Sequence, residues 1–158
     1  MRSIARTFIG AALVVVFVFL WSAPADRDVV GAQTTKTIKM TRIYTGPDGQ
    51  SHAEEVDLPL TTGTATAMFQ ATGVQFRRTP PGTFSDWHVG PRRQFVITLS
   101  GRGEIGLANG RKIELVPGKI ELIEDTTGKG HTTRAVGNED RISIAIPLAD
   151  QTIGAPLR

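Results

Sequence analysis

Short stretches of alternating residues, most of them closed by glycine, proline or asparagine, follow one another along the chain from residue 36 to residue 147. The turn signals recur about every 8 to 12 residues, and the segments between them lack the 3.6-residue period of an amphipathic helix. Asn109-Gly110 is the clearest signal, because both positions of a two-residue hairpin turn favour positive φ. Many short strands with tight turns predict an all-β sandwich or jelly-roll barrel.

The expected strands share a two-residue alternation of side chains and an enrichment in β-branched or aromatic residues. In the segment 64–78, Ala67, Phe69, Val74 and Phe76 are expected to contribute to the core. The first strand is expected at the edge of a sheet. The full set covers residues 36–44, 52–60, 64–78, 92–100, 104–108, 111–115, 119–123, a segment from His131 onward, and 141–147.

The start of the chain has the layout of a secretory signal peptide. Two arginines precede an apolar run from Phe8 to Trp21, and small residues follow up to Ala25. The run falls short of the roughly 20 apolar residues that a membrane-spanning helix needs. We therefore expect a signal peptide over residues 1–25, with cleavage after Ala25 or as late as Ala32.

The rest of the chain has the length of one domain. We expect residues 26–35 to form a disordered leader and residues 36–158 to form a single β-barrel domain. The expected location is the periplasm or the outside of the cell, because a cleaved signal peptide implies export. The alternative is a protein that stays anchored to the membrane by an uncleaved N-terminal segment.

The amino-acid composition of the chain limits the classes of partner that it can bind and the side chains that a metal site can use. The formal charge of the whole chain is +3, and loss of Arg2 and Arg6 with the signal peptide lowers it to +1. A nearly neutral domain gives little support to nucleic-acid binding, which requires clustered positive charge. The chain has no cysteine, so it forms no disulfide, and a metal site has to use histidine, carboxylate or amide ligands.

The residues with the most distinctive chemistry lie in the run from Gly82 to Gly101, GTFSDWHVGPRRQFVITLSG. If the backbone is extended through this run, His88, Gly90, Arg92 and Gln94 point to one side and into one cavity. The turn signal formed by Gly90 and the following proline opposes such an extended path. An inward Arg92 would suit a carboxylate or phosphate group, and an outward one would pair with a neighbouring acidic residue.

The spacing in two segments resembles the two conserved motifs of the cupin superfamily. The first motif is G(X)5HXH(X)3,4E(X)6G, and Gly82, His88, Gly90, Gln94 and Gly101 occupy its positions, with glycine in place of the second histidine and glutamine in place of the glutamate. The second motif is G(X)5-7PXG(X)2H(X)3N. Its positions fall on Gly118, Thr126, Gly128, His131 and Ala135, with threonine for proline and alanine for asparagine. The sequence is similar to small single-domain bacterial cupins whose function is uncharacterised.

This resemblance implies a double-stranded β-helix barrel of the jelly-roll type, with a site inside it. Many cupins hold one Fe, Mn, Ni, Cu or Zn ion there on three histidines and a glutamate. Carried over to this chain, His88 and His131 occupy two histidine positions and Gln94 the carboxylate position, while Gly90 has no ligating side chain. The resemblance therefore implies a weakened metal site, and it also makes a homodimer plausible.

Two functions remain open from the sequence. The first is an exported enzyme, oxygenase-like or isomerase-like, that depends on a divalent metal ion at His88, His131 and Gln94. The alternative is a non-catalytic, metal-free module that binds a small anionic ligand with Arg92, Gln94 and the two histidines. Trp87 is expected at the mouth of the pocket, where its ring either packs against the barrel or contacts a ligand.

Overall fold

The computed structural model describes residues 37–61 and 63–149. The expected signal peptide over residues 1–25 and the leader over residues 26–35 lie outside the described residues. Within the described part, all regular secondary structure is β. No helix of sufficient length and hydrophobicity to cross a membrane occurs in those residues.

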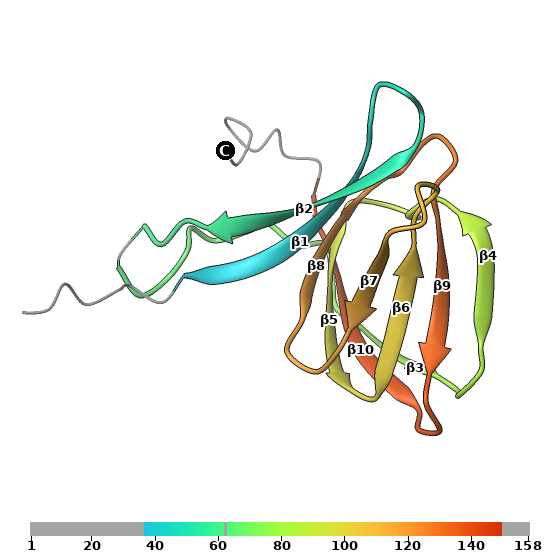
Figure 1. The fold of residues 1–158 in the computed structure, drawn as a ribbon. Coiled ribbons are helices and arrows are strands. Elements are labelled where there is room, and N and C mark those ends of the chain that lie inside the picture. The colour runs from blue at the N-terminus through green and yellow to red at the C-terminus, as the bar shows by residue number, and fades with distance from the viewer. Residues whose placement is uncertain (1–36, 62, 150–158) are drawn as a thin grey trace, which may run out of the picture. The chain divides into compact units, whose positions relative to one another are not determined.

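Ten strands of the described residues form two sheets that face each other as the two layers of a barrel (Figure 1). The six-stranded sheet has the order β2-β1-β8-β5-β10-β3, and the four-stranded sheet has the order β4-β9-β6-β7. The strands are β1 (Ile38–Thr45), β2 (Ser51–Leu58), β3 (Gln75–Thr79), β4 (Phe84–His88), β5 (Gln94–Ser100), β6 (Arg102–Gly106), β7 (Lys112–Leu115), β8 (Ile120–Glu124), β9 (His131–Val136) and β10 (Arg141–Pro147).

The eight strands from β3 to β10 are divided equally between the sheets, in the orders β8-β5-β10-β3 and β4-β9-β6-β7. Apart from the hairpin of β6 and β7, each consecutive pair of these strands crosses from one sheet to the other. This interleaving is that of a jelly roll built from two Greek keys. It confirms the predicted all-β, double-stranded β-helix fold.

Strand β1 was expected at an edge, and the structure corrects this prediction. It pairs with β2 in the antiparallel sense and with β8 in the parallel sense, so that β2 forms the edge of the sheet. Alternation of side chains describes the two faces of a strand and carries no information on whether its two edges are paired. The edge prediction therefore lacked a physical basis in the sequence.

Two apolar clusters lie on opposite faces of the six-stranded sheet, because neighbouring residues of one strand belong to different clusters. Val96 of β5 belongs to the cluster inside the barrel, whereas Phe95 belongs to the outer one. The inner cluster consists of Ile43, Val96, Ile105, Leu107, Ile113, Leu115, Ile123 and Ala145. The outer cluster consists of Met40, Val56, Leu58, Phe95, Leu122 and Leu148, with Phe69, Ile120 and Ile146 packed against it.

The segment before β3 contributes less to the core than expected. Phe69 packs edge-on against Phe95, with ring centroids 4.9 Å apart. Ala67 is exposed, and the exposed fractions of Val74 and Phe76 are 61% and 71%, so the prediction that these three are core residues is wrong. Since β3 is an edge strand and Phe76 lies on its outward face, no neighbouring element covers that side chain.

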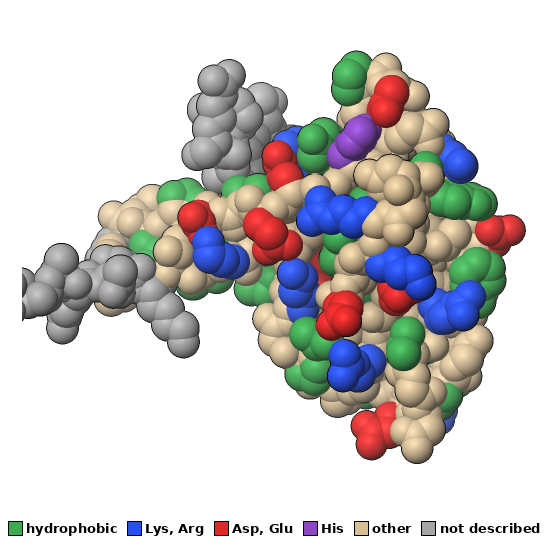
Figure 2. Space-filling view, in the orientation of Figure 1, with side chains coloured by type: hydrophobic (Ala, Val, Ile, Leu, Met, Phe, Trp, Pro, Cys, Tyr) green, Lys and Arg blue, Asp and Glu red, His purple; other side chains and the backbone are tan. Residues whose placement is uncertain are grey.

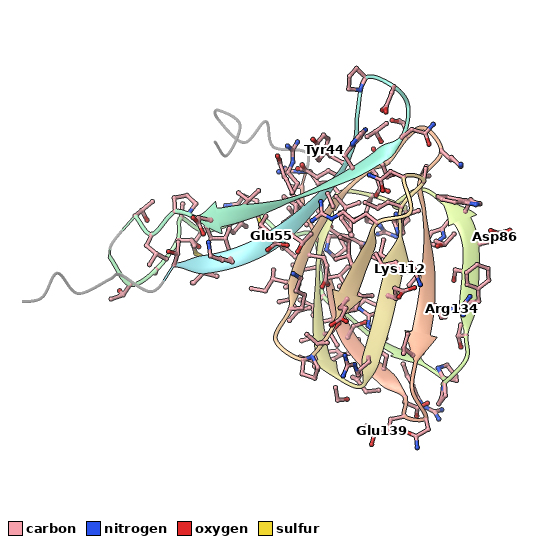
Figure 3. The ribbon with its side chains drawn as sticks, in the orientation of Figure 1. Tyr44, Glu55, Asp86, Lys112, Arg134 and Glu139 are labelled. Carbon is pink, nitrogen blue, oxygen red and sulfur yellow. The ribbon has the colours of Figure 1, made fainter. Side chains whose placement is uncertain are left out.

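The outer face of the four-stranded sheet is covered by charged side chains of both signs (Figure 2). Lys112 lies 3.0 Å from Glu104, and Arg102 lies 3.6 Å from Glu114, on the neighbouring strands β6 and β7. Lys112 is labelled on this face in Figure 3. Exposed ion pairs add little stability, but they show which residues of these strands point outward. The alternate positions, such as Ile105, point into the barrel.

The loop before β9 approaches the end of β4 so closely that only glycine fits there. Gly130 has a φ of +74°, and a Cβ atom at this position would overlap the carbonyl group of His88. Gly110 provides a matched control, with a φ of +83° and open space around the corresponding position.

We expect Gly130→Ala to destabilise the protein by more than Gly110→Ala. Gly110→Ala should cost about 1 to 2 kcal/mol, the penalty of left-handed backbone for a residue with a Cβ. Gly130→Ala should exceed this, because the backbone of His88 also has to move. Urea unfolding measures both free energies, and equal losses would show that the loop does not press against β4.

Candidate functional site

A cavity of about 200 Å³ lies inside the barrel and is lined by residues of both sheets. The inner apolar cluster fills the rest of the interior, and Val96, Ile105, Leu115 and Ile123 form part of the cavity wall. Several polar side chains also face it, namely Arg77, His88, Gln94, Glu121, His131 and Arg141.

The polar wall follows from the alternation of the six-stranded sheet. Strand β10 has the sequence RISIAIP, in which Arg141, Ser143 and Ala145 are buried and the intervening isoleucines lie on the opposite face. The strand register places Ser143 beside Arg77 of β3. It also places Glu121 of β8 beside Val96 of β5. The inward positions of four adjacent strands therefore carry charged or polar groups to one interior surface.

The two histidines lie side by side at one end of the cavity. His88 and His131 are paired across strands β4 and β9, and their ring centroids are 4.6 Å apart. Nδ1 of His88 lies 2.6 Å from the backbone oxygen of Asp86. Because a carbonyl oxygen only accepts hydrogen bonds, Nδ1 donates, and Nε2 of a neutral ring keeps its lone pair for a ligand.

Asp125 orients the second histidine. Nδ1 of His131 donates to Oδ2 of Asp125 over 2.6 Å, and the same oxygen accepts from Oγ of Ser51 over 2.7 Å. Both Asp125 and His131 are buried. The backbone oxygen of Asp125 also accepts from the N–H of Gly90. The carboxylate of Asp125 therefore leaves Nε2 of His131 available in the cavity. The backbone oxygen of Asp86 has the same effect on His88.

Besides the two histidines, the ionisable side chains that line the cavity are those of two arginines and one glutamate. Nε and Nη2 of Arg141 donate to Oγ1 of Thr98, at 3.1 Å and 2.9 Å. Nη2 of Arg77 lies 3.5 Å from Oε1 of Gln94. Within the described residues, neither arginine lies within 4.0 Å of a carboxylate oxygen. Burial lowers the pKa of both guanidinium groups from their ordinary value.

Glu121 is completely buried, and neither of its carboxyl oxygens has a hydrogen-bond partner among the described residues. Burial raises the pKa of Glu121 to about 8, against the opposing attraction of Arg141 and Lys119. The carboxyl group is therefore mainly protonated at neutral pH. The cavity then carries the positive charge of Arg77 and Arg141 without a compensating carboxylate.

The strand order of the two sheets identifies the fold, and one histidine of each motif faces the interior of the barrel. The chain has the cupin fold. No protein-family model matches the sequence, and no curated protein matches it significantly.

Solved structures that resemble the chain include several cupins. A cupin-like protein from Thermotoga maritima is 20% identical, with a TM-score of 0.42 over 66% of this chain and 75% of the other. A cupin protein from Bacteroides fragilis is also 20% identical, with a TM-score of 0.40 over 58% and 75% of the two chains. A sugar phosphate isomerase of the cupin superfamily from Silicibacter pomeroyi is 18% identical, with a TM-score of 0.38 over 72% of each chain.

The donor set of this cavity does not fit a tightly held transition metal. At Gly90, the position of the second cupin histidine, a Cβ atom would lie 2.5 Å from Cγ2 of Ile123. A side chain at this position would therefore have to displace Ile123. Within the described residues, no three side chains of His, Cys, Asp or Glu gather around one point. Two imidazoles and the amide of Gln94 remain, and the amide brings no negative charge.

His88, Gln94 and His131, which the sequence placed in one pocket, all line the same cavity. Arg92 is exposed and Trp87 is 43% exposed, and neither is among the residues that line it. Strand β4 ends at His88 and β5 begins at Gln94 in the other sheet, so the alternation does not continue through the bend between them. The ring of Trp87 instead lies 4.3 Å from Nζ of Lys129.

Four residues with a clear place in the site were not predicted. Asp125 carried a usable signal, since it precedes His131 by one short loop in EDTTGKGH. Arg77, Glu121 and Arg141 are ordinary charged residues of alternating strands, where an outward position is the usual one. No local feature of the sequence identified them as inward.

We expect the stability of the protein to depend on pH through Glu121. The pKa of its carboxyl is about 8 in the folded state and near 4.5 when unfolded. Between these values the folded protein retains a proton that the unfolded chain releases. Stability therefore falls as pH rises through this window, by up to roughly 1.4 kcal/mol per pH unit, and levels off above it.

Urea unfolding at several pH values between about 4.5 and 8.5 measures this slope. Glu121→Gln should flatten it, because the amide has no proton to lose in this range. Glu104→Gln, on the outer sheet face, is the matched control and should keep the wild-type profile. Identical profiles for wild type and Glu121→Gln would show that the buried carboxyl is ionised.

Proposed function

We propose that this protein is an exported cupin that binds a small anionic molecule inside its barrel without a resident metal ion. The observation that carries the proposal is that two arginines, Arg77 and Arg141, line one interior cavity, and that no carboxylate oxygen of the described residues lies within 4.0 Å of either. Arg141 is buried and Arg77 is half-buried, and a cation removed from water is costly unless it is paired. An anionic ligand would supply the missing partner.

The rest of the cavity suits a small oxygenated molecule. His88 and His131 offer Nε2 atoms that accept hydrogen bonds from ligand hydroxyl groups, and Gln94 offers an amide. The volume of about 200 Å³ is below the range of about 300 to 1,000 Å³ that is common for drug-sized ligands. A carboxylate or phosphate of a few carbon atoms fits this space better than a large cofactor.

The metal-dependent enzyme is the less favoured function for this chain, because its residues offer two imidazoles and an amide in place of three imidazoles and a carboxylate. The binding function requires only groups that are present in the cavity. It therefore should persist in protein treated with a chelator.

We expect EDTA-treated protein to bind at least one of inorganic phosphate, propionate and lactate in isothermal titration calorimetry. Arg77→Met should weaken that affinity about tenfold or more, since hydrogen bonds to charged groups contribute about 1.5 to 3 kcal/mol. Arg78→Met is the matched control. Arg78 is the next residue of β3, is exposed and pairs with Asp140 outside the barrel.

Arg78→Met should bind the same anion with wild-type affinity. Equal losses in both variants would indicate a general charge effect and contradict an interior anion site. Binding that appears only after a divalent ion is added would favour the metal-dependent enzyme.

The export part of the proposal rests on the sequence of the first 25 residues, with their arginines, apolar run and small residues. The expected result is a mature protein that begins after Ala25 or Ala32, measured by intact mass on protein recovered from the periplasm or medium. Recovery of the full-length chain from the membrane fraction would instead support the uncleaved anchor.

A further inference from the structure

Glu121 is the most unusual residue of the cavity, because its carboxyl is buried and unsatisfied. It has no exposed surface, and both oxygens lack a hydrogen-bond partner among the described residues. In folded proteins about nine in ten or more buried polar groups are paired. Glu121 is among the residues that line the cavity, together with Arg77, Arg141 and the two histidines.

The polar groups that surround Glu121 are each engaged elsewhere. Thr41, its cross-strand neighbour on β1, donates its hydroxyl to Glu55 over 2.5 Å. Nζ of Lys119 lies 3.2 Å from the same Glu55. Arg141 of β10 directs Nε and Nη2 to Thr98 of β5.

The remaining neighbour in the register, Val96 of β5, is apolar. The hydrogen bonds of Thr41, Lys119 and Arg141 thus all go to partners other than the carboxyl of Glu121. A partner for it has to come from whatever fills the cavity.

We propose that Glu121 is a ligand-binding residue that selects a hydroxyl group, so that the bound molecule is a small hydroxy-carboxylate or hydroxy-phosphate. This inference rests on the proposed anion-binding function of the same cavity. The anionic group of the ligand pairs with Arg77 and Arg141, and its hydroxyl group forms a hydrogen bond with the carboxyl of Glu121.

A hydroxyl is the group that best satisfies this carboxyl. It accepts a hydrogen bond from the protonated acid and donates one to the carboxylate, so it fits both protonation states. An ammonium group in this position would lie in the field of two arginines, and an apolar group would leave both oxygens unpaired. A ligand without the hydroxyl therefore leaves the penalty of an unsatisfied buried group in place.

Glu121 lies on β8 and Arg141 on β10, with β5 between them, and both residues line the cavity. A small ligand in this cavity therefore meets residues of both strands.

The test compares ligands that differ only in the hydroxyl group. Lactate against propionate is the first pair, and glycerol 3-phosphate against propyl phosphate is the second. In isothermal titration calorimetry, wild-type protein should bind the hydroxylated member of at least one pair about tenfold or more tightly. In Glu121→Met the ratio should fall to near one, while affinity for the plain anion is kept or increased.

Glu104→Met is the control, since Glu104 lies on the outer sheet face and should leave both affinities unchanged. The wild-type ratios need no variant, so the proposal can be overturned even if Glu121→Met does not fold. Equal affinity within both pairs would refute hydroxyl selection while anion binding stands. If folded Glu121→Met still prefers the hydroxylated ligands, a residue other than Glu121 selects the hydroxyl group. Absence of binding for all four compounds would refute hydroxyl selection, and absence of binding for inorganic phosphate as well would refute the anion-binding function.

Discussion

The site depends on the fact that the central strands of the six-stranded sheet are covered on both faces. The outer apolar cluster, which includes Phe95 and Leu122, lies on its outer face, and its inner face borders the cavity. Because the outer cluster buries one set of alternating residues, the inner set does not have to be entirely apolar. Strand β10 shows this division, with isoleucines directed outward and Arg141 and Ser143 directed inward. A jelly roll without the outer cover would need those inner positions for its core.

Two features of the structure lower the free-energy cost of placing charged side chains inside this barrel. Arg141 retains two hydrogen bonds to Thr98, and protonation of Glu121 avoids an isolated buried carboxylate. An ionised, unpaired group in such a place would cost several kcal/mol. The residual cost is the unsatisfied hydrogen bonding of the Glu121 carboxyl. Destabilised polar groups of this kind concentrate at binding and catalytic sites.

The histidine pair depends on a different constraint, the contact between β4 and the loop before β9. Gly130 allows that loop to approach the backbone of His88. Asp125 orients the ring of His131 by accepting a hydrogen bond from its Nδ1. The same part of the barrel excludes a third imidazole, because Ile123 fills the space beside Gly90. Among the described residues, the presence of two imidazoles without a third is therefore a consequence of packing as well as of residue identity.

Much of the fold was predictable from the chain, because turn residues and two-residue alternation are local properties. The motif spacing also placed His88, Gln94 and His131 in one pocket, where the structure has them. The inward position of Arg92 was not supported, because the bend before Gln94 moves the chain from one sheet to the other. Phe76 was expected inside for its hydrophobicity, yet its strand lies at an edge with nothing over that face.

By itself the sequence determined the strand-rich architecture, the turns and the position of the two histidines along the chain. Only the tertiary structure decided that Glu121 and Arg141 face inward, that Asp125 supports His131, and that Ile123 occupies the space beside Gly90. Alternation divides a strand into two faces, but it does not say which of them is enclosed. That choice is made by strand pairing and sheet packing between segments far apart in the chain.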